Sequence, residues 1–243
     1  MVVRECCDTD ARASSSDRAN PLWFAGDVHG KFGHVLRQLE KTSLDARPSA
    51  IIFLGDLEPQ EPLTRIFGWF IDAGVQPYFI HGNHDSDHGG TWRYIVDCWE
   101  RNLHGRVTEM FGIKVAGLGG IFRSDIWLPP TRPRYQSYDD YTRATELTAL
   151  RCMHSSSIFP DVVCALSQQH ADILVTHEAP SCNSLGYLAI TNLAVALGVK
   201  SVFNGHHHRD IAYQSNYPFA GYQVGFRGLR DSHGTIIKSG GYG

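Results

Sequence analysis

Residues that commonly bind metal ions occur in five separate clusters along this chain of 243 residues. Each cluster closes a short apolar run and is flanked by a glycine or a turn. The clusters are Asp27 with His29, then Asp56, then Asn83 with His84 and Asp85, then His177, and finally His206, His207 and His208. Carboxylate, imidazole and amide ligands without cysteine sulfur form a set suited to Mn, Fe or Zn. The sequence therefore predicts one metal site built from distant segments.

The elements that must position these clusters are strands alternating with helices. Residues 21–30 and 49–56 have the pattern of buried strands ending in glycine turns, and the apolar residues between them recur at helical spacing. Strand, helix, strand is the unit of a layered, mostly parallel sheet, so we expect an α/β fold. Further strands are predicted over 76–85, 112–122, 171–180 and 200–208, and helices over 62–74, 139–153 and 184–197. Loops at the carboxyl ends of parallel strands line one crevice, which allows the clusters to converge.

Each residue also has an ordinary structural explanation. Asp27 could cap the following helix, Asp56 could be a turn residue, and His177 could be a satisfied core histidine. Five such residues placed at the ends of five predicted strands are not explained by turn chemistry alone. We therefore favour the metal site over the separate structural explanations.

Composition places few limits on function. The net charge of −3 gives no general attraction to nucleic acid or to an anionic membrane. Residues 1–20 lack the apolar core of a signal peptide and are predicted to form a flexible tail, as are residues 239–243. The six cysteines form no CxxC pair, which favours reduced thiols and a cytoplasmic location. No apolar run is long enough to cross a membrane.

The ordered motifs resemble those of the calcineurin-like metallophosphoesterase superfamily. They are GDVHG at 26–30, GD at 55–56, GNHD at 82–85, His177, and GHHH at 205–208. The resemblance implies a four-layer α/β/β/α sandwich with a dinuclear metal centre at one edge. We expect this domain to span residues 21–238, with residues 124–170 as an insertion or cap-like segment that could carry specificity.

The resemblance also implies a role for each site residue. One metal ion would be held by Asp27, His29, Asp56 and His208, and the other by Asp56, Asn83, His177 and His206, with Asp56 bridging. The expected cofactors are two divalent or trivalent ions, with Mn²⁺ first and Fe or Zn²⁺ as alternatives.

The implied reaction is attack on a phosphate ester by a metal-bridging hydroxide. His84 would be the catalytic histidine that assists the leaving group, and Asp85 could orient its ring through a hydrogen bond.

Side-chain alternation supports part of this assignment independently. Residues two apart in an extended segment point the same way, which pairs Asp27 with His29 and His206 with His208. His207 is then expected to point away from both metals.

The substrate is less constrained. Protein serine/threonine phosphatases and bacterial dinucleoside tetraphosphatases carry phosphate-gripping arginines in GDxxDRG and RGNHE, whereas this chain reads GDLEPQ at 55–60 and HGNHD at 81–85. Both arginines are absent, and His81 replaces the second. This departure weighs against a protein phosphatase.

A second resemblance concerns VAGLGGIFRS at 115–124, which is similar to a stretch of RNA lariat debranching enzymes. It makes Arg123 the first candidate for binding phosphate. Four functions remain open: a phosphomonoesterase, a phosphodiesterase or nuclease acting on nucleotides or RNA, a protein phosphatase, and a catalytically silent metal-dependent scaffold.

Overall fold

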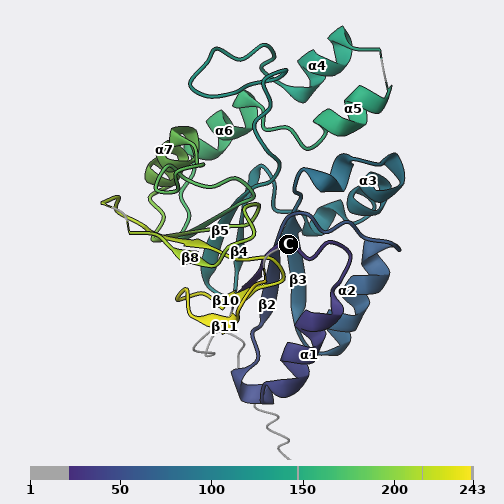
Figure 1. Ribbon diagram of the computed structural model, residues 1–243, viewed down its shortest axis with the longest axis vertical. Coiled ribbons are helices and arrows are strands. Elements are labelled where there is room, and N and C mark those ends of the chain that lie inside the picture. The colour runs from purple at the N-terminus through teal and green to yellow at the C-terminus, as the bar shows by residue number, and fades with distance from the viewer. Residues whose placement is uncertain (1–21, 147, 215, 242–243) are drawn as a thin grey trace, which may run out of the picture.

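The computed structural model describes residues 22–146, 148–214 and 216–241, and contains two β-sheets packed face to face between helices (Figure 1). The predicted tail over 1–20 and residues 242–243 lie outside the described residues. Residues 239–241 of the predicted C-terminal tail are described, and there Gly241 N donates a hydrogen bond to Phe226 O.

The first sheet has the strand order β11-β10-β1-β2-β3. Its strands are β1 Leu22–Ala25, β2 Ala50–Leu54, β3 Gln76–Ile80, β10 Leu229–Asp231 and β11 Ile236–Lys238. β1, β2 and β3 run parallel, while β10 is antiparallel to both β1 and β11. The parallel part therefore places three strand ends side by side.

The second sheet has the order β4-β5-β6-β7-β9-β8. Its strands are β4 Arg106–Met110, β5 Ile113–Leu118, β6 Ile173–Thr176, β7 Ser201–Asn204, β8 Ile211–Ala212 and β9 Ala220–Gln223. The run from β5 through β6 and β7 to β9 is parallel, and the edge strands β4 and β8 are antiparallel to their neighbours.

Helices cover the outer face of each sheet. α1 Gly33–Lys41, α2 Leu63–Asp72 and α3 Gly89–Val96 pack on the first sheet, and α6 Pro160–Ser167 and α7 Leu188–Leu197 pack on the second. The apolar stripe of α1, which includes Val35 and Leu39, is buried against Ile51 and Phe53 of β2. The four-layer α/β/β/α sandwich is therefore confirmed.

The described part of the segment 124–170 contains three helices where one was predicted, and the first two correspond to the predicted helix. α4 Tyr138–Ala144 and α5 Thr148–His154 are separated because Thr145 adopts an extended backbone, with φ −126° and ψ 122°. α6 was not predicted. Short 3₁₀ turns occur at Leu44–Ala46, His84–Ser86 and Trp99–Arg101. None of the described helices has both the length and the apolar character needed to cross a bilayer.

The two sheets meet through a dry aromatic contact. Phe24 of β1 and Phe203 of β7 stack with ring centroids 3.9 Å apart and an interplanar angle of 11°, and both side chains are completely buried. Phe203 also stacks on Tyr222 of β9. This contact ties together the two sheets that carry the candidate site.

Phe24→Ala is expected to lower the free energy of unfolding by about 3–5 kcal/mol, because it removes a buried ring and leaves a cavity between the sheets. Chemical denaturation followed by circular dichroism measures the change. Leu44→Ala is the matched control, since Leu44 is 72% exposed. Equal effects of the two substitutions would contradict the importance of the inter-sheet contact.

Candidate metal centre

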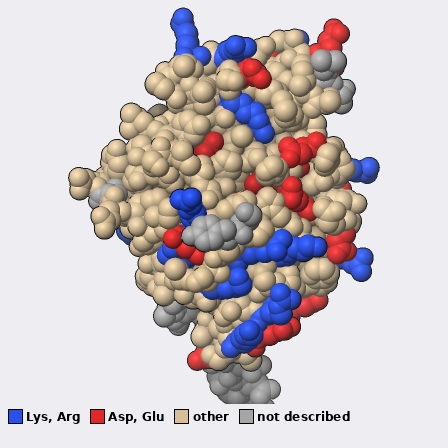
Figure 2. Space-filling view, in the orientation of Figure 1, with Lys and Arg blue, Asp and Glu red and all other residues tan. Residues whose placement is uncertain are grey.

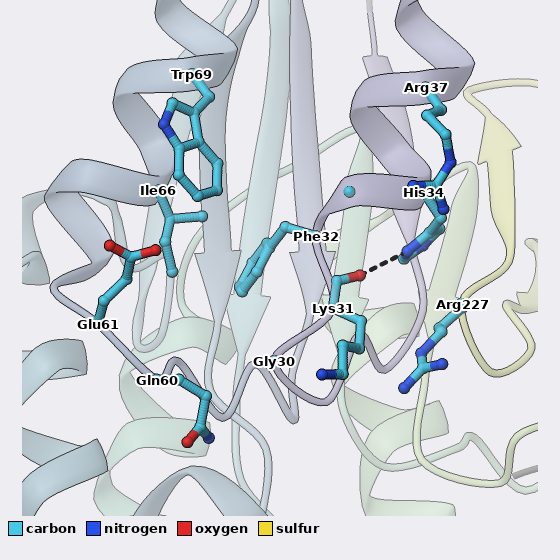
Figure 3. A pocket seen from close by; sticks show the side chains of 11 residues that line it. Gly30, Lys31, Phe32, His34, Arg37, Gln60, Glu61, Ile66, Trp69 and Arg227 are labelled. Atoms are coloured by element: carbon cyan, nitrogen blue, oxygen red, sulfur yellow. Dashed lines mark hydrogen bonds between the residues drawn. The ribbon is translucent and has the colours of Figure 1, made fainter.

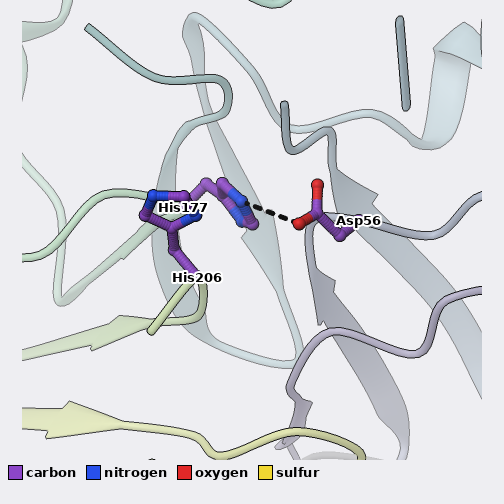
Figure 4. Close-up of side chains that lie close together, drawn as sticks. All are labelled: Asp56, His177 and His206. Carbon is purple, nitrogen blue, oxygen red and sulfur yellow. Dashed lines mark ion pairs between the residues drawn. The ribbon is translucent and has the colours of Figure 1, made fainter. Parts of the chain in front are cut away.

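Residues from all five sequence clusters meet at the carboxyl ends of five parallel strands. Asp27 follows β1, Asp56 follows β2, Asn83 follows β3, His177 follows β6, and His206 follows β7. One ligand atom each from Asp56, His177 and His206 lies within 4.8 Å of the other two, as Figure 4 shows from close by. His29 and His208 complete the group, since His29 Nε2 lies 4.0 Å from Asp56 Oδ2 and 3.4 Å from His208 Nε2.

His177 lies at the centre of the group and is completely buried. Its Nδ1 donates a hydrogen bond to Leu54 O over 2.7 Å, so Nε2 faces the other way. Nε2 lies 3.1 Å from Asn83 Oδ1 and 3.4 Å from Asp56 Oδ2. A ring held from behind by a carbonyl oxygen is how proteins orient a metal-binding histidine.

His29 is held in a similar way, by a carboxylate instead of a carbonyl oxygen. Its Nδ1 donates to Glu58 Oε2 over 2.9 Å, and its Nε2 lies 3.4 Å from His208 Nε2 and 4.0 Å from Asp56 Oδ2. Phe226 lies against the rings of both His29 and His208. Asp56 Oδ2 is therefore shared by two imidazoles, each with an outer hydrogen bond that directs Nε2 inward.

Two glycines allow the loops to come this close. Gly55 has φ 103°, a conformation that side chains rarely adopt, and a Cβ there would collide with the ring of His177. A Cβ on Gly82 would collide with Asp56 and with His177. The glycines of the GD and GNHD motifs therefore serve close packing around the site.

The carboxylates are buried in a site that lacks lysine and arginine partners. Asp27 and Asp56 are 0% and 1% exposed, and among the described residues all their ion pairs are with histidines. Burial raises the pKa of Asp27 to about 7. Burial acts in the same direction on Asp56, but the charge of His177 and its hydrogen bond outweigh it and lower the pKa of Asp56.

The histidines differ in their electrostatic setting. Burial opposes protonation of His177, yet the charges of Asp56 and Asp27 raise its pKa to about 10. Burial, together with the positive charge of His177, lowers the pKa of His206 to about 3, and burial also lowers the pKa of His208. The lowered pKa values of His206 and His208 favour the neutral imidazole, the form that binds metal ions.

The backbone of the histidine triplet is not extended, so the premise of the alternation argument is wrong. His206 and His208 both have positive φ, 72° and 56°, and His207 N donates to Gly205 O in a tight turn. His206 is fixed by its N–H, which donates to both carboxylate oxygens of Asp27. The ring of His206 nevertheless lies against His177, while that of His208 lies against His29. Left-handed residues, rather than strand pleating, direct these two rings.

His207→Ala is expected to change metal content and activity much less than His206→Ala or His208→Ala. His207 contacts the ring of His206, and its Nε2 is buried without a hydrogen-bond partner among the described residues. The three alanine variants differ only in position within one turn and are therefore matched. Bound metal and phosphoesterase turnover are measured on each, and equal losses in all three would refute the distinction.

The GNHD segment forms a 3₁₀ turn in which Asp85 does not hold the ring of His84, which corrects the expected partnership. Asp85 is buried and accepts backbone hydrogen bonds from Glu58 N and Gly82 N, each 2.8 Å long. The ring of His84 is held instead by Asp87, whose Oδ2 lies 2.7 Å from Nδ1. The reason is geometric, because residues three apart meet on a helical turn whereas adjacent ones diverge.

Asp85 therefore acts on the backbone, where it ties the GNHD turn to the loop after β2. Burial and the neighbouring charge of Asp56 raise the pKa of Asp85 to about 7. For His84, burial is outweighed by the hydrogen bond to Asp87 and by the charge of Asp56, and the pKa of its imidazole is raised.

Two other residues singled out in the sequence make structural contacts. Arg123 donates hydrogen bonds to Ser156 O, Ser156 Oγ and Ser157 Oγ, so its observed partners belong to the turn after α5. His81 is completely buried beside Asn102 and the rings of Trp92 and Trp99, and burial lowers its pKa well below the usual value. His81 thus cannot replace the missing phosphatase arginine as an exposed cation.

Sequence reasoning missed Glu58 and Asp87, which hold the rings of His29 and His84. Asp87 had a signal, since it stands three residues after His84 in a short turn. Glu58 had none, because its contact spans 29 positions and depends on a positive φ of 41°.

Comparisons with known proteins agree with this fold. A protein from Haemophilus influenzae, described as uncharacterized, is 37% identical over 225 residues, covering 89% of this chain and 96% of that protein. A solved crystal structure superimposes with a TM-score of 0.55 over 88% of this chain and 96% of its own, at 13% identity, which shows a shared fold. Residues 21–210 match the family model described as calcineurin-like phosphoesterase. The chain belongs to the calcineurin-like phosphoesterase family.

Proposed function

We propose that this protein is a phosphoesterase that uses two metal ions at the cluster around Asp56. Membership of the family implies metal-dependent hydrolysis of phosphate esters. The observation that carries the proposal is the position of Asp56 Oδ2, 3.4 Å from His177 Nε2 and 4.0 Å from His29 Nε2. A carboxylate shared by two imidazoles that are each oriented from outside is suited to bridge two cations.

The residues fit a pair of metal ions by their chemistry. On one side of Asp56 would be Asp27, His29 and His208, and on the other Asn83, His177 and His206. Two buried carboxylates without lysine or arginine partners need positive charge beside them. His177 would release its proton when a cation binds, since only the neutral ring is a ligand. The oxygen and nitrogen donors suit Mn²⁺ first, with Fe and Zn²⁺ as alternatives.

Two bound metal ions would supply a nucleophile from water near neutral pH, orient the phosphate and neutralise charge on its oxygens. The chain itself supplies the proton for the leaving group. His84 is about half exposed, and its Nδ1 is engaged by Asp87, which leaves Nε2 available toward the substrate. The raised pKa of His84 keeps a larger fraction of the ring protonated, as a general acid requires.

The contacts of His81 and the missing arginines disfavour a protein phosphatase. A monoesterase and a diesterase are distinguished by measuring hydrolysis of p-nitrophenyl phosphate, a monoester, and of bis-p-nitrophenyl phosphate, a diester. The protein is first treated with a chelator, and Mn²⁺ is then added back. We expect hydrolysis of at least one of them to depend on the added metal. Hydrolysis of neither, by folded protein that has bound metal, would favour a silent scaffold and overturn the proposal.

A further inference from the structure

A pocket of about 390 Å³ lies beside the candidate metal centre, between the start of α1 and the loop that leads into α2. We call it the α1 pocket. Figure 3 shows that Lys31, His34, Arg37 and Arg227 line one side, and that Trp69, Ile66, Gln60 and Glu61 line the other. Gly30, which also lines it, directly follows His29 of the metal centre.

The cations of this pocket have no carboxylate partners. Among the described residues, no Asp or Glu oxygen lies within 4.0 Å of a side-chain nitrogen of Lys31, Arg37 or Arg227, so their charges are not neutralised by the protein. Glu61, the acidic residue of the lining, lies on the opposite side and pairs with Arg65 at 3.1 Å. Figure 2 shows Lys and Arg side chains in the lower half of the view, with Asp and Glu side chains beside them. A chain of net charge −3 thus carries a local positive site.

The backbone at the start of α1 adds to the preference for an anion. α1 begins at the pocket without a side-chain cap and with no acidic residue in its first turn, so its positive end is not compensated.

Two residues of the pocket are close in sequence to residues of the metal centre or to a residue that packs on it. Lys31 is two residues after His29, and Arg227 directly follows Phe226, whose ring contacts His29 and His208. The backbone N–H of Arg227 donates to Asp27 O. The lining of the α1 pocket therefore begins one residue from His29, a candidate metal ligand.

We propose that the α1 pocket binds a second phosphate group of the substrate, which makes a phosphate ester carrying two phosphoryl groups the preferred substrate class. Guanidinium groups match phosphate oxygens geometrically, and three cations without carboxylate partners exceed what one ligand carboxylate would need. Trp69, 41% exposed, and the apolar atoms of Ile66 offer contact to the organic part that joins the two phosphates. This inference rests on the proposed phosphoesterase function and specifies its substrate.

The test compares alkanediol bisphosphates of two to six carbons with the monophosphates of the same diols. Both members of each pair share the reacting bond, so the ratio of their kcat/KM values, corrected for two equivalent phosphates, reports the second phosphate alone. If bis-p-nitrophenyl phosphate is the better model substrate, the same pairs are used as methyl diesters. We expect the wild-type ratio to exceed about ten for at least one chain length, the size of one charge-assisted hydrogen bond.

Arg37→Ala and Lys31→Ala are expected to bring this ratio toward one. Both side chains are exposed, so the fold does not depend on them. Lys41→Ala, on the same helix but outside the pocket, and Arg93→Ala, 81% exposed on α3, are the matched controls and should keep the wild-type ratio. A wild-type ratio near one at every length, or a ratio that survives in both pocket variants, would overturn the proposal.

Free phosphate is the other possible source of the anion, and a second measurement separates it. Inhibition by inorganic phosphate is measured on wild type and Arg37→Ala. If Arg37→Ala weakens this inhibition while the substrate ratio stays near one, the pocket binds a free ion and the substrate assignment is wrong. Failure of the underlying function is recognised separately, because hydrolysis of both p-nitrophenyl substrates would then be absent in the wild type.

Discussion

Asp56→Asn is expected to remove bound metal and to lower phosphoesterase turnover by more than about a hundredfold, the upper range for residues that only orient metal ligands. The substitution keeps the size of the side chain. It replaces either Oδ2, which lies near His177 and His29, or Oδ1 by an amide nitrogen, and it removes the negative charge. An uncharged amide is a poor bridging ligand for two cations, so both halves of the centre are weakened together.

The measurement combines metal analysis with steady-state kinetics on the same preparation. Asp72→Asn is the matched control, because Asp72 is exposed at the end of α2 and makes the same chemical change away from the site. A folded Asp56→Asn protein that retained both metals and most of its turnover would show that Asp56 does not bridge. Loss of folding is checked by circular dichroism.

His84→Ala is expected to leave the metals in place and to lower turnover of an alkyl phosphate by about a hundredfold or more, the usual worth of a general acid. The loss should be much smaller for p-nitrophenyl phosphate, since p-nitrophenolate leaves without a proton. This dependence on the leaving group separates proton donation from a structural role. The ring of His84 is 46% exposed, so its removal should not disturb the core.

Asp87→Asn extends this test to the residue that holds the ring. Because Asp87 Oδ2 lies 2.7 Å from His84 Nδ1, the amide should weaken the orientation of the ring and give a loss between those of wild type and His84→Ala. His88→Ala, an exposed histidine four residues further on, is the control. Full activity of His84→Ala on an alkyl phosphate would be incompatible with the assigned acid.

The alternation of strands and helices and the meeting of the five clusters could be predicted from local patterns, whereas the two-sheet sandwich was implied only by the resemblance of the motifs to a known family. Apolar runs ending in glycine turns specify buried parallel strands, and the carboxyl ends of such strands meet at one edge. Gly55 and Gly82 stand in the motifs because a Cβ at either position would enter the site. The motif glycines therefore indicate both the turns that follow the strands and the close packing around the site.

The partners of the histidine rings could not be predicted with the same success. Which carboxylate holds His84 depends on the direction of side chains in a 3₁₀ turn, and the sequence places Asp85 and Asp87 almost equally near. The contact of Glu58 with His29 depends on tertiary placement of the loop after β2. His206 and His208 have left-handed backbones, which are rare for residues other than glycine. The alternation of side chains along a strand does not predict such conformations.

The α1 pocket was also outside the reach of sequence patterns. Its cations come from residues 31 and 37 near α1 and from residue 227 near the C-terminus, and their convergence requires the pairing of β10 with β1. Counting charges over the chain gives a negative total and conceals this local surplus.

The central claim, two metal ions held by one cluster and required for hydrolysis, is tested most directly by metal titration of chelator-treated protein. Bound Mn²⁺ is measured by mass spectrometry of the metal, and hydrolysis of the better p-nitrophenyl substrate is followed in parallel. The account predicts that activity returns as binding approaches two ions per chain. Full hydrolysis by metal-free protein, or binding that stops at one ion with full activity, would contradict it.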